Sequence, residues 1–251
     1  MKIGVIGSAY NCAEFLNKCL EPWESLKNNS EHEFYFSFIH NCFKENRELG
    51  FDKHSQDQTD GILKEKKFID SYVFSEEFLT EAESRNVCLK NMKKDVDYVW
   101  TLGFDELFTK QQINKCIEFV SVNPLVAWFK INYKNYIFDG KSWIDGFCPP
   151  RIFNNRTNGG ISELYYDDDF LYKDGSDYKI LSNLEIPKSI AHIKHMTWLH
   201  SNGKAKVEYQ KKRWGENGCG YSWNNEANML EFNSEHYERH NLPLPILNYD
   251  E

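Results

Sequence analysis

Two carboxylates follow an apolar run near the middle of the chain. The run Asp97–Leu102 reads as a strand and is followed by Gly103–Glu106, which contains Asp105 and Glu106. Ligands of parallel α/β sheets gather at the carboxyl ends of strands, so an acid pair there is placed for chemistry. Carboxylates suit Mg²⁺ or Mn²⁺, and such a cation can neutralise a diphosphate as it leaves. The alternative is structural, because Asp105 could cap the helix expected after Thr109.

Histidines and basic residues gather in the last quarter of the chain. His192, His195 and His200 lie close together, and a neutral imidazole is a reasonable metal ligand beside one carboxylate. We expect His195 to be that ligand, with surface histidines as the alternative. A concentrated basic stretch follows the histidines. Its cations could clamp a departing diphosphate, although a solvated helix face would explain the stretch equally well. The stretch consists of Lys204, Lys206, Lys211, Lys212 and Arg213.

Short apolar runs alternate with helical patterns in the first half, which is typical of a parallel sheet with crossover helices. A helix is expected from Ala13, with Pro22 and residues 28–30 as its breakers. The polar stretch Asn41–Gly61 is expected to be an irregular surface loop, and Leu125–Ile137 one long aromatic strand. Further strands are expected at Lys2–Ile6, Glu33–Ile39 and Phe68–Phe74, and further helices at Glu77–Met92 and Gln111–Phe119.

Composition narrows the classes of protein that fit. The 251 residues suffice for one large domain. A net charge of -8 argues against a polyanionic partner such as DNA, although the basic stretch from Lys204 to Arg213 leaves a nucleic-acid acceptor as an alternative. The seven cysteines are odd in number and never form a C-x-x-C pair, which argues against a disulfide framework or a thiolate zinc site. No apolar run approaches the roughly 20 residues of a membrane helix, and the start lacks signal-peptide features. We therefore expect a cytoplasmic protein without a membrane span.

Three segments of the first 110 residues resemble GT-A glycosyltransferases of family 2, in the expected order. The strand Ile3–Ile6 followed by Ala9, Tyr10 and Asn11 resembles their first strand and "YN" turn. Thr80–Asn86 looks like their "EA-x-x-RN" helix start, and Val99–Glu106 is similar to "W-x-L-D-A-D-E", whose D-x-D motif binds metal and nucleotide sugar.

The resemblance implies a GT-A (Rossmann-like) α/β fold, with a mostly parallel sheet flanked by helices and a C-terminal acceptor and lid region. Residues 1–110 would form the nucleotide-sugar-binding half, and residues 111–251 the acceptor-binding and lid half, of one domain. The implied activity is transfer of a sugar from a nucleotide-diphosphate sugar to an acceptor hydroxyl, with inversion and with Mn²⁺ or Mg²⁺.

Site residues follow from the same resemblance. Asp105 and His195 would hold the metal, and Arg151 in an "R-x-F" strand would pair with a nearby acid or support the fold. Donor contacts would come from the turn and the helix start together with the basic stretch, namely Ala9, Tyr10, Asn11, Arg85, Asp105, Lys204 and Lys206.

An inverting transfer needs a carboxylate that takes the proton of the acceptor hydroxyl, and clustered acids raise each other's pKa toward useful values. The acid cluster Asp167, Asp168 and Asp169 could supply this base, with Asp168 preferred, or could be a solvated turn. The aromatic content of 16% is high, and rings in the second half could wall an acceptor site. These rings are Tyr165, Tyr166, Trp198, Trp214, Tyr221 and Trp223.

Two departures from the family pattern bear on the donor. Gly103 stands where the first acid of D-x-D is expected, which lowers the charge of the site by one. The segment His40–Cys42 replaces an acid-rich turn that often reads the base, which leaves the nucleotide open. A non-catalytic carbohydrate-binding protein is an alternative, and so is a sugar nucleotidyltransferase, although no Gly-rich phosphate loop follows the first strand.

Overall fold

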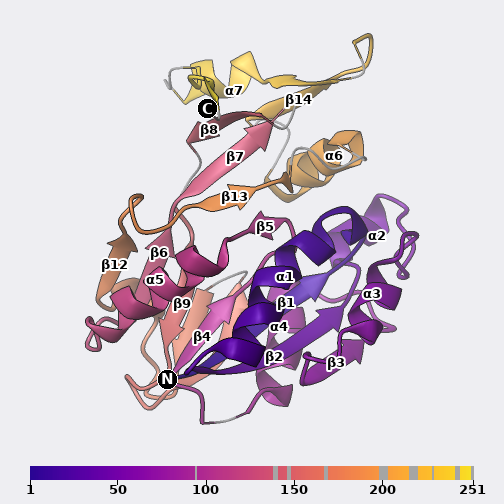
Figure 1. Ribbon diagram of the computed structural model, residues 1–251. Coiled ribbons are helices and arrows are strands. Elements are labelled where there is room, and N and C mark those ends of the chain that lie inside the picture. Colours follow the sequence, from indigo (N-terminus) through magenta and orange to yellow (C-terminus); the bar gives the residue numbers. More distant parts are fainter. Residues whose placement is uncertain are drawn as a thin grey trace.

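A seven-stranded sheet forms the centre of the protein. The computed structural model describes residues 1–93, 95–137, 141–145, 148–166, 169–197, 203–214, 220–227, 229–240 and 244–249. Within them, the strands of this sheet are β1 (Lys2–Ala9), β2 (Glu33–His40), β3 (Ser71–Phe74), β4 (Tyr98–Thr101), β6 (Trp128–Ile131), β9 (Pro150–Asn154) and β12 (Asn183–Ile186). Their order is β12-β6-β9-β4-β1-β2-β3 (Figure 1).

Most neighbours in this sheet are parallel. Strand β1 pairs in parallel with β2 and β4, β2 with β3, and β12 with β6. Strand β9 is antiparallel to both of its neighbours. The expected α/β class with a mostly parallel sheet is therefore confirmed, and strands from both sides of residue 110 belong to the same sheet.

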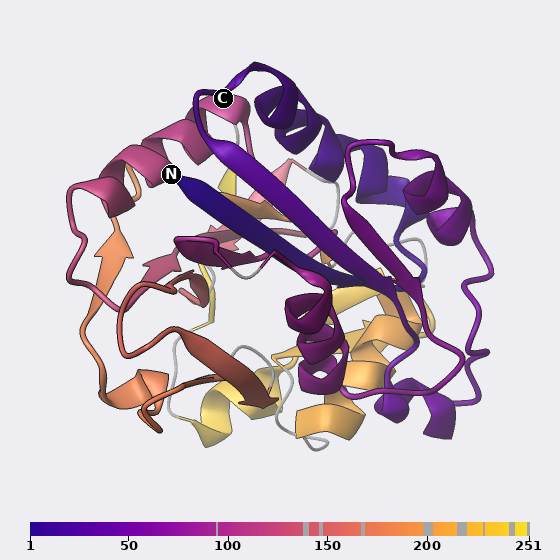
Figure 2. The ribbon, with the colours of Figure 1, turned by 90° about the horizontal axis from the view of Figure 1, so that it is seen from below.

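Helices cover both faces of the sheet. Helices α1 (Ala13–Asn29) and α5 (Lys110–Ser121) lie on one face and α4 (Glu81–Asn91) lies on the other (Figure 2). On the first face the ring of Trp23 meets that of Trp100 edge-on, with centroids 4.9 Å apart. Phe36 and Phe38 are buried in the same cluster, and Phe15 is buried as well, so these aromatics of the first half form core.

Local sequence signals set the helix starts. Helix α4 begins with a capping box, in which the Thr80 hydroxyl and the Glu83 carboxylate each accept from the other's backbone N–H. Thr109 and Gln112 form the same arrangement before α5. The cap of α5 is therefore Thr109, and the alternative in which Asp105 caps this helix is wrong.

Two expectations for the first half need correction. Pro22 does not end α1, because the helix continues to Asn29 and buries Trp23 and Leu26. The stretch Asn41–Gly61 is not an irregular loop, because it contains α2 (Lys44–Glu48) and the start of α3 (Thr59–Glu65). Short helices with few apolar anchors leave little periodicity for sequence reasoning to detect.

The expected long strand Leu125–Ile137 divides at Asn132. Its first part is β6 of the large sheet, and its second part is β7 (Tyr133–Ile137) of a five-stranded sheet. That second sheet also contains β5 (Glu106–Leu107), β8 (Ser142–Asp145), β13 (Ile193–His195) and β16 (Asn248–Tyr249), in the order β16-β8-β7-β13-β5. Aromatic and aliphatic residues recur on both sides of Asn132, and this continuity concealed the change of sheet.

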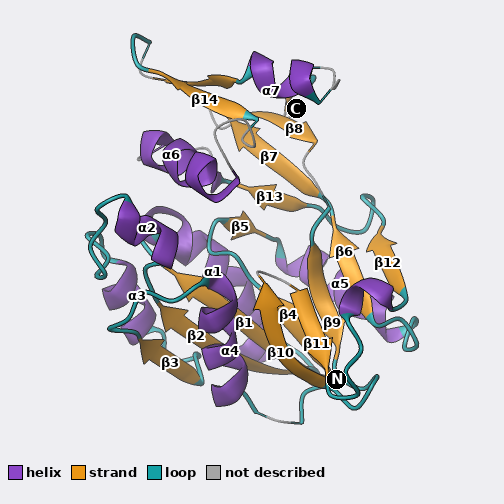
Figure 3. Cartoon of the chain, turned by 180° about the vertical axis from the view of Figure 1, so that it is seen from behind, coloured by secondary structure: helices purple, strands orange, loops and turns teal. Residues whose placement is uncertain are grey.

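The remaining elements lie at the two ends of the molecule. Helix α6 (Gly203–Trp214), the hairpin β14 (Tyr221–Asn224) and β15 (Met229–Phe232), and α7 (Ser234–Arg239) surround the five-stranded sheet at the top of Figure 3. The hairpin β10 (Ile161–Tyr166) and β11 (Asp169–Tyr172), followed by a 3-10 turn at Tyr178–Ile180, packs beside α4 on the large sheet. Among the described residues, no helix combines the length and apolarity needed to cross a bilayer.

Candidate active site

The turn Gly103–Glu106 carries the chain from the large sheet into the small one. Leu102 still donates to the Ile6 carbonyl at 2.9 Å, and the turn closes when the Glu106 N–H donates to the Gly103 carbonyl at 3.1 Å. Strand β13 pairs antiparallel with β5, with His195 opposite Glu106. The Met196 N–H donates to the Asp105 carbonyl at 2.8 Å. Sheet pairing thus brings a late histidine beside the acids of the fourth strand, as the sequence predicts.

Asp105 and His195 face each other across a short gap. The imidazole Nε2 of His195 lies 3.7 Å from Oδ2 of Asp105, with 14% and 25% of the two side chains exposed. The hydroxyl of buried Thr197 donates to the same Oδ2 atom. The Nδ1 atom of His195 lies 2.6 Å from Oδ1 of Asn135, and the ring stacks on Tyr133 at a centroid distance of 4.3 Å.

The electrostatics leave a negative carboxylate beside a neutral imidazole. Burial lowers the pKa of His195 to about 4, with Lys206 and Arg151 acting in the same direction and Asp105 opposing them. Burial opposes ionisation of Asp105, but the nearby His195 and Lys206 and the hydrogen bond from Thr197 outweigh it, so its pKa is lowered. At neutral pH Asp105 is therefore ionised, while His195 keeps an unprotonated ring nitrogen.

Glu106 has a structural role beside this pair. Its carboxylate is 1% exposed and accepts from Arg151, with 3.0 Å from Nε and 2.6 Å from Nη2 to Oε1. The Tyr133 hydroxyl donates to Glu106 and accepts from Arg151. Burial raises the pKa of Glu106, and the Arg151 guanidinium offsets part of that rise. Of the two roles expected for Arg151, pairing with an acid near the site is confirmed.

Gly103 is closely packed by the two acids that follow it. A Cβ atom at this position would lie 2.9 Å from Oε1 of Glu106 and 3.0 Å from Oδ1 of Asp105. Real Cβ atoms do not approach a carboxylate that closely, so any side chain would displace one of these acids. Gly103 stands where the D-x-D pattern has its first acid, and the turn leaves no room there for the side chain of an acid.

The turn after β1 is held by a segment that sequence reasoning took for a loop. Asn11 has a φ of 45°, its N–H donates to Ser55 Oγ at 2.9 Å, and its Oδ1 accepts from the Gln56 N–H at 2.8 Å. Asp57 accepts from the Ala13 N–H at 2.9 Å, at the start of α1. The Tyr10 hydroxyl donates to the Asp52 carbonyl.

The proposed donor contacts at this turn are therefore engaged within the protein. Ala9 is 1% exposed, so its side chain offers a ligand no surface. His40, after which the base-reading turn was expected, is fully buried, with its ring stacked on Phe74 at 4.8 Å and its Nε2 2.7 Å from Ser55 Oγ.

The basic candidates separate into different places. Lys206 on α6 lies close enough to Asp105 and His195 to lower the pKa of both. Lys204 is exposed and donates to Asn225 Oδ1 at 2.8 Å. Arg85 is 4% exposed on α4 and pairs with Glu81, 2.6 Å from Nη2 to Oε1. Of these three, Lys206 is the one whose charge acts on the acid and the histidine.

Part of the predicted acid cluster can be located. Asp169 is 9% exposed at the start of β11, where it accepts from the Tyr178 hydroxyl and from Lys179 Nζ at 2.6 Å. Asp167 and Asp168 lie outside the described residues, as do Trp198 and His200 and the side chains of Tyr166 and Trp214.

The described aromatics of the second half do not line one surface. Tyr165 is exposed on the β10–β11 hairpin and donates to Asp177 at 2.7 Å. Tyr221 and Trp223 on β14 instead pack with Val207 of α6 and Ile144 of β8. These rings therefore lie in two separate places, Tyr165 on the β10–β11 hairpin and the other two on the β14–β15 hairpin.

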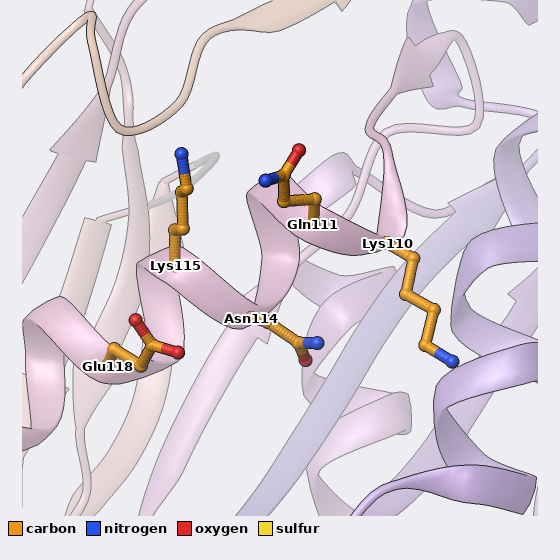
Figure 4. A pocket seen from close by; sticks show the side chains of 5 residues that line it. All are labelled: Lys110, Gln111, Asn114, Lys115 and Glu118. Atoms are coloured by element: carbon orange, nitrogen blue, oxygen red, sulfur yellow. The ribbon is translucent and has the colours of Figure 1, made fainter.

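A shallow depression on α5 is separate from this site. Its described lining residues all come from α5, and in Figure 4 Gln111 and Lys115 point to one side of the helix while Lys110 and Asn114 point to another. They are Lys110, Gln111, Asn114, Lys115 and Glu118. Because these side chains do not converge on a common point, they do not form a ligand-binding site together.

A cation would have two protein ligands here. Asp105 offers a carboxylate oxygen, which suits Mn²⁺ or Mg²⁺, and His195 offers a neutral ring nitrogen, which is a common metal ligand. Phosphate oxygens would complete the set. In the part of the chain that the structure describes, no three His, Cys, Asp or Glu side chains gather as a metal cage. Six cysteines in that part are free thiols, and five of them are buried.

Sequence reasoning missed several residues that shape this site. Thr197, Asn135 and Tyr133 contact Asp105 or His195, yet their types and spacing carry no signal by themselves. Ser55 and Asp57 were hidden in the assumed loop. Polar residues that follow the end of β2 could have drawn attention to that segment, since strand ends are where ligands and their supports gather.

Comparisons of sequence find no match for this chain, either among protein-family models or among curated proteins. Comparison of structures finds TarS of S. aureus, a glycosyltransferase. TarS 1-349 matches with a TM-score of 0.51 and 15% identity, over 84% of this chain and 64% of that one. A structure titled simply TarS matches with a TM-score of 0.50 and 16% identity, over 86% and 40%.

TarS 1-349 in complex with UDP-GlcNAc matches with a TM-score of 0.45 and 16% identity, over 84% of this chain and 65% of that one. The chain thus spans less than two thirds of the length of each of these three structures. At such identities the likeness concerns the fold alone. This chain therefore shares the Rossmann-like α/β fold seen in TarS.

Proposed function

We propose that this chain transfers a sugar from a nucleotide-diphosphate sugar to an acceptor hydroxyl, with inversion. The observation that carries the proposal is the approach of Asp105 to His195 at the carboxyl end of β4, 3.7 Å between Oδ2 and Nε2. The fold shared with TarS supports it, and the complex of TarS with UDP-GlcNAc makes UDP sugars the first donors to test.

Mn²⁺ or Mg²⁺ is proposed at this place, held by Asp105 and His195 and completed by diphosphate oxygens. When bound, such a cation neutralises the charge that develops on the leaving diphosphate. The chain's own residues prepare the place: Thr197 orients the Asp105 carboxylate, and Lys206 adds a positive charge on the same side.

The acceptor side remains a proposal from the sequence. A carboxylate of the segment Asp167–Asp169 would take the proton of the acceptor hydroxyl while the anomeric carbon is attacked from the side opposite the diphosphate. Asp169 is already engaged by Tyr178 and Lys179, which favours Asp167 or Asp168 for this role. We retain Asp168 as the proposed base.

Donor turnover tests the proposal. The purified protein is incubated with UDP-GlcNAc, UDP-glucose, UDP-galactose and GDP-mannose in Mn²⁺, and the released nucleoside diphosphate is measured. We expect slow hydrolysis of at least one donor, abolished by Asp105→Ala and by chelation. Asp95→Ala is the matched control, because Asp95 is a half-exposed acid that pairs with Lys2 on the surface.

The outcomes separate the competing functions. Release of pyrophosphate instead of nucleoside diphosphate would indicate a nucleotidyltransferase. Binding of glycans without hydrolysis of any donor would indicate a carbohydrate-binding protein. An Asp105→Ala variant with unchanged turnover would contradict the proposed site even if a donor is hydrolysed.

A further inference from the structure

Asn135 and His195 are direct neighbours across two parallel strands. The pairing of β13 with β7 places His195 opposite Asn135, and the pairing of β13 with β5 places Glu106 on the other side. Side chains of directly paired residues project from the same face of a sheet. Asn135 is 9% exposed, so its amide lies in the interior beside the imidazole.

The contact between these residues determines which ring nitrogen carries the proton. Oδ1 of Asn135 lies 2.6 Å from Nδ1 of His195. An amide oxygen can only accept a hydrogen bond, so with Oδ1 facing the ring this contact is a hydrogen bond in the tautomer whose proton is on Nδ1. A neutral imidazole has a single N–H, and Nε2 therefore keeps its lone pair.

A second contact holds the plane of the ring. Tyr133 stacks on His195 with an angle of 19° between the rings, and its hydroxyl is fixed by Glu106 and Arg151. A quarter turn of the imidazole about its Cβ–Cγ bond would break both the hydrogen bond to Asn135 and the stack on Tyr133. The ring is thus held both at its edge and on its face.

The nitrogen that keeps its lone pair, Nε2 of His195, faces the carboxylate of Asp105. Oδ2 of Asp105 is 3.7 Å from Nε2, beyond the range of a hydrogen bond. Two metal bonds of about 2.0–2.2 Å each would span this gap with a bend at the ion. The separation therefore suits two ligands of one cation.

We propose that Asn135 is a positioning residue, which holds His195 in the Nδ1–H tautomer so that Nε2 is directed to a divalent cation shared with Asp105. The inference rests on the proposed function, because it assigns a role toward the cation of that site. Outer partners of this kind typically change metal affinity by about 10–100-fold when they are removed.

The tautomer is measured without donor, nucleotide or metal. In protein labelled with 15N-histidine, NMR separates the protonated ring nitrogen from the one with a lone pair, and His195→Gln identifies the signal. We expect Nδ1–H in the native protein, and a mixture or the opposite tautomer in Asn135→Leu. A native protein with Nε2–H would overturn the inference at once.

Metal affinity supplies the second readout. Binding of Mn²⁺ with UDP is followed by electron paramagnetic resonance, and Asn135→Leu is expected to raise the dissociation constant about tenfold. Asn135→Asp keeps an acceptor for Nδ1–H and is expected to restore most of the affinity. Asn132→Leu is the matched control, because Asn132 is a buried neighbour that binds Glu185 instead of His195.

These arms distinguish the inference from the proposed function. Mn²⁺ binding that is unchanged in Asn135→Leu would overturn the inference alone, and the glycosyltransferase proposal would stand. A native protein with the Nδ1–H tautomer but no Mn²⁺ affinity would overturn the role toward the cation and count against the proposed function as well.

Discussion

Oδ2 of Asp105 and Nε2 of His195 lie 3.7 Å apart, although one residue follows the fourth strand of the large sheet and the other ends a strand much later in the chain. The two-residue strand β5 produces this meeting, because it pairs with β13 directly after the turn that carries Asp105. An ionised acid and a neutral histidine thus face one another at the edge where the two sheets join.

Restoring the first acid of the D-x-D pattern should damage the site. In Gly103→Asp the new Cβ would meet Glu106 and Asp105 at 2.9–3.0 Å and displace one of them. We expect Mn²⁺ affinity with UDP to fall at least tenfold, measured by calorimetry. Gly103→Ala, which adds only the Cβ, should show a loss of similar size, whereas tighter binding in Gly103→Asp would contradict this account of the turn.

Lys206 and Lys204 should differ in their effect on nucleotide binding. Lys206 acts on Asp105 and His195, whereas Lys204 is exposed and bound to Asn225. Because a bond to a charged group contributes about 1.5–3 kcal/mol, Lys206→Ala should weaken binding of a nucleoside diphosphate at least tenfold. Lys204→Ala is the matched control and should change the affinity for the nucleoside diphosphate less than twofold. Equal losses in the two variants would contradict a specific role for Lys206.

The buried pair of Glu106 and Arg151 should dominate the stability of the junction. Arg151→Met leaves a carboxylate uncompensated in the interior, and we expect a loss of about 3–5 kcal/mol in the free energy of unfolding. The double variant with Glu106→Gln should recover part of this loss. Lys64→Met, which breaks the exposed pair with Asp60, should cost about 0.5 kcal/mol or less, and urea unfolding measures all three.

Asp97 should make stability depend on acid pH. Partial burial opposes its ionisation, but the Lys2 N–H and the Arg156 guanidinium outweigh this and lower its pKa. A carboxyl whose pKa is lowered by folding stabilises the protein at neutral pH, and this contribution is lost as the pH falls through the lowered value. Asp97→Asn should therefore cost about 2 kcal/mol at pH 7.

The difference between native protein and Asp97→Asn should shrink below about pH 4, where the carboxyl of the unfolded chain takes up a proton, and should vanish below the lowered pKa of the native carboxyl. Asp95→Asn offers a control in the same loop, since Asp95 pairs with Lys2 at the surface. A loss in Asp97→Asn that stays constant down to pH 3 would show that shape, and not charge, sets the effect.

Much of this architecture could be predicted from local patterns. The strand near Glu33–Ile39 and the helix near Gln111–Phe119 were found because their apolar spacing is regular. The proximity of Asp105 and His195 was also predicted, and Arg151 was expected to pair with a nearby acid or to support the fold. Charged and imidazole side chains inside a protein need a partner of complementary chemistry, and few residues of this chain could serve as that partner.

The rest depends on contacts that the sequence does not encode locally. The division of Leu125–Ile137 at Asn132 follows from which sheet each part joins, and both parts carry aromatic and aliphatic residues. The caps that Ser55 and Asp57 provide to the turn after β1 come from a segment without periodicity. The crowding around Gly103 is a property of packing, so its absent side chain was first interpreted as a loss of charge.

Calorimetric titration of nucleoside diphosphates in the presence and absence of Mn²⁺ tests the central claim most directly. UDP, GDP, CDP and ADP are titrated into the native protein and into Asp105→Ala and His195→Ala. We predict that at least one of them binds only with Mn²⁺ and that both variants lose this binding. Binding that needs neither Mn²⁺ nor Asp105, or no binding of any nucleotide, would contradict a donor site built on Asp105 and His195.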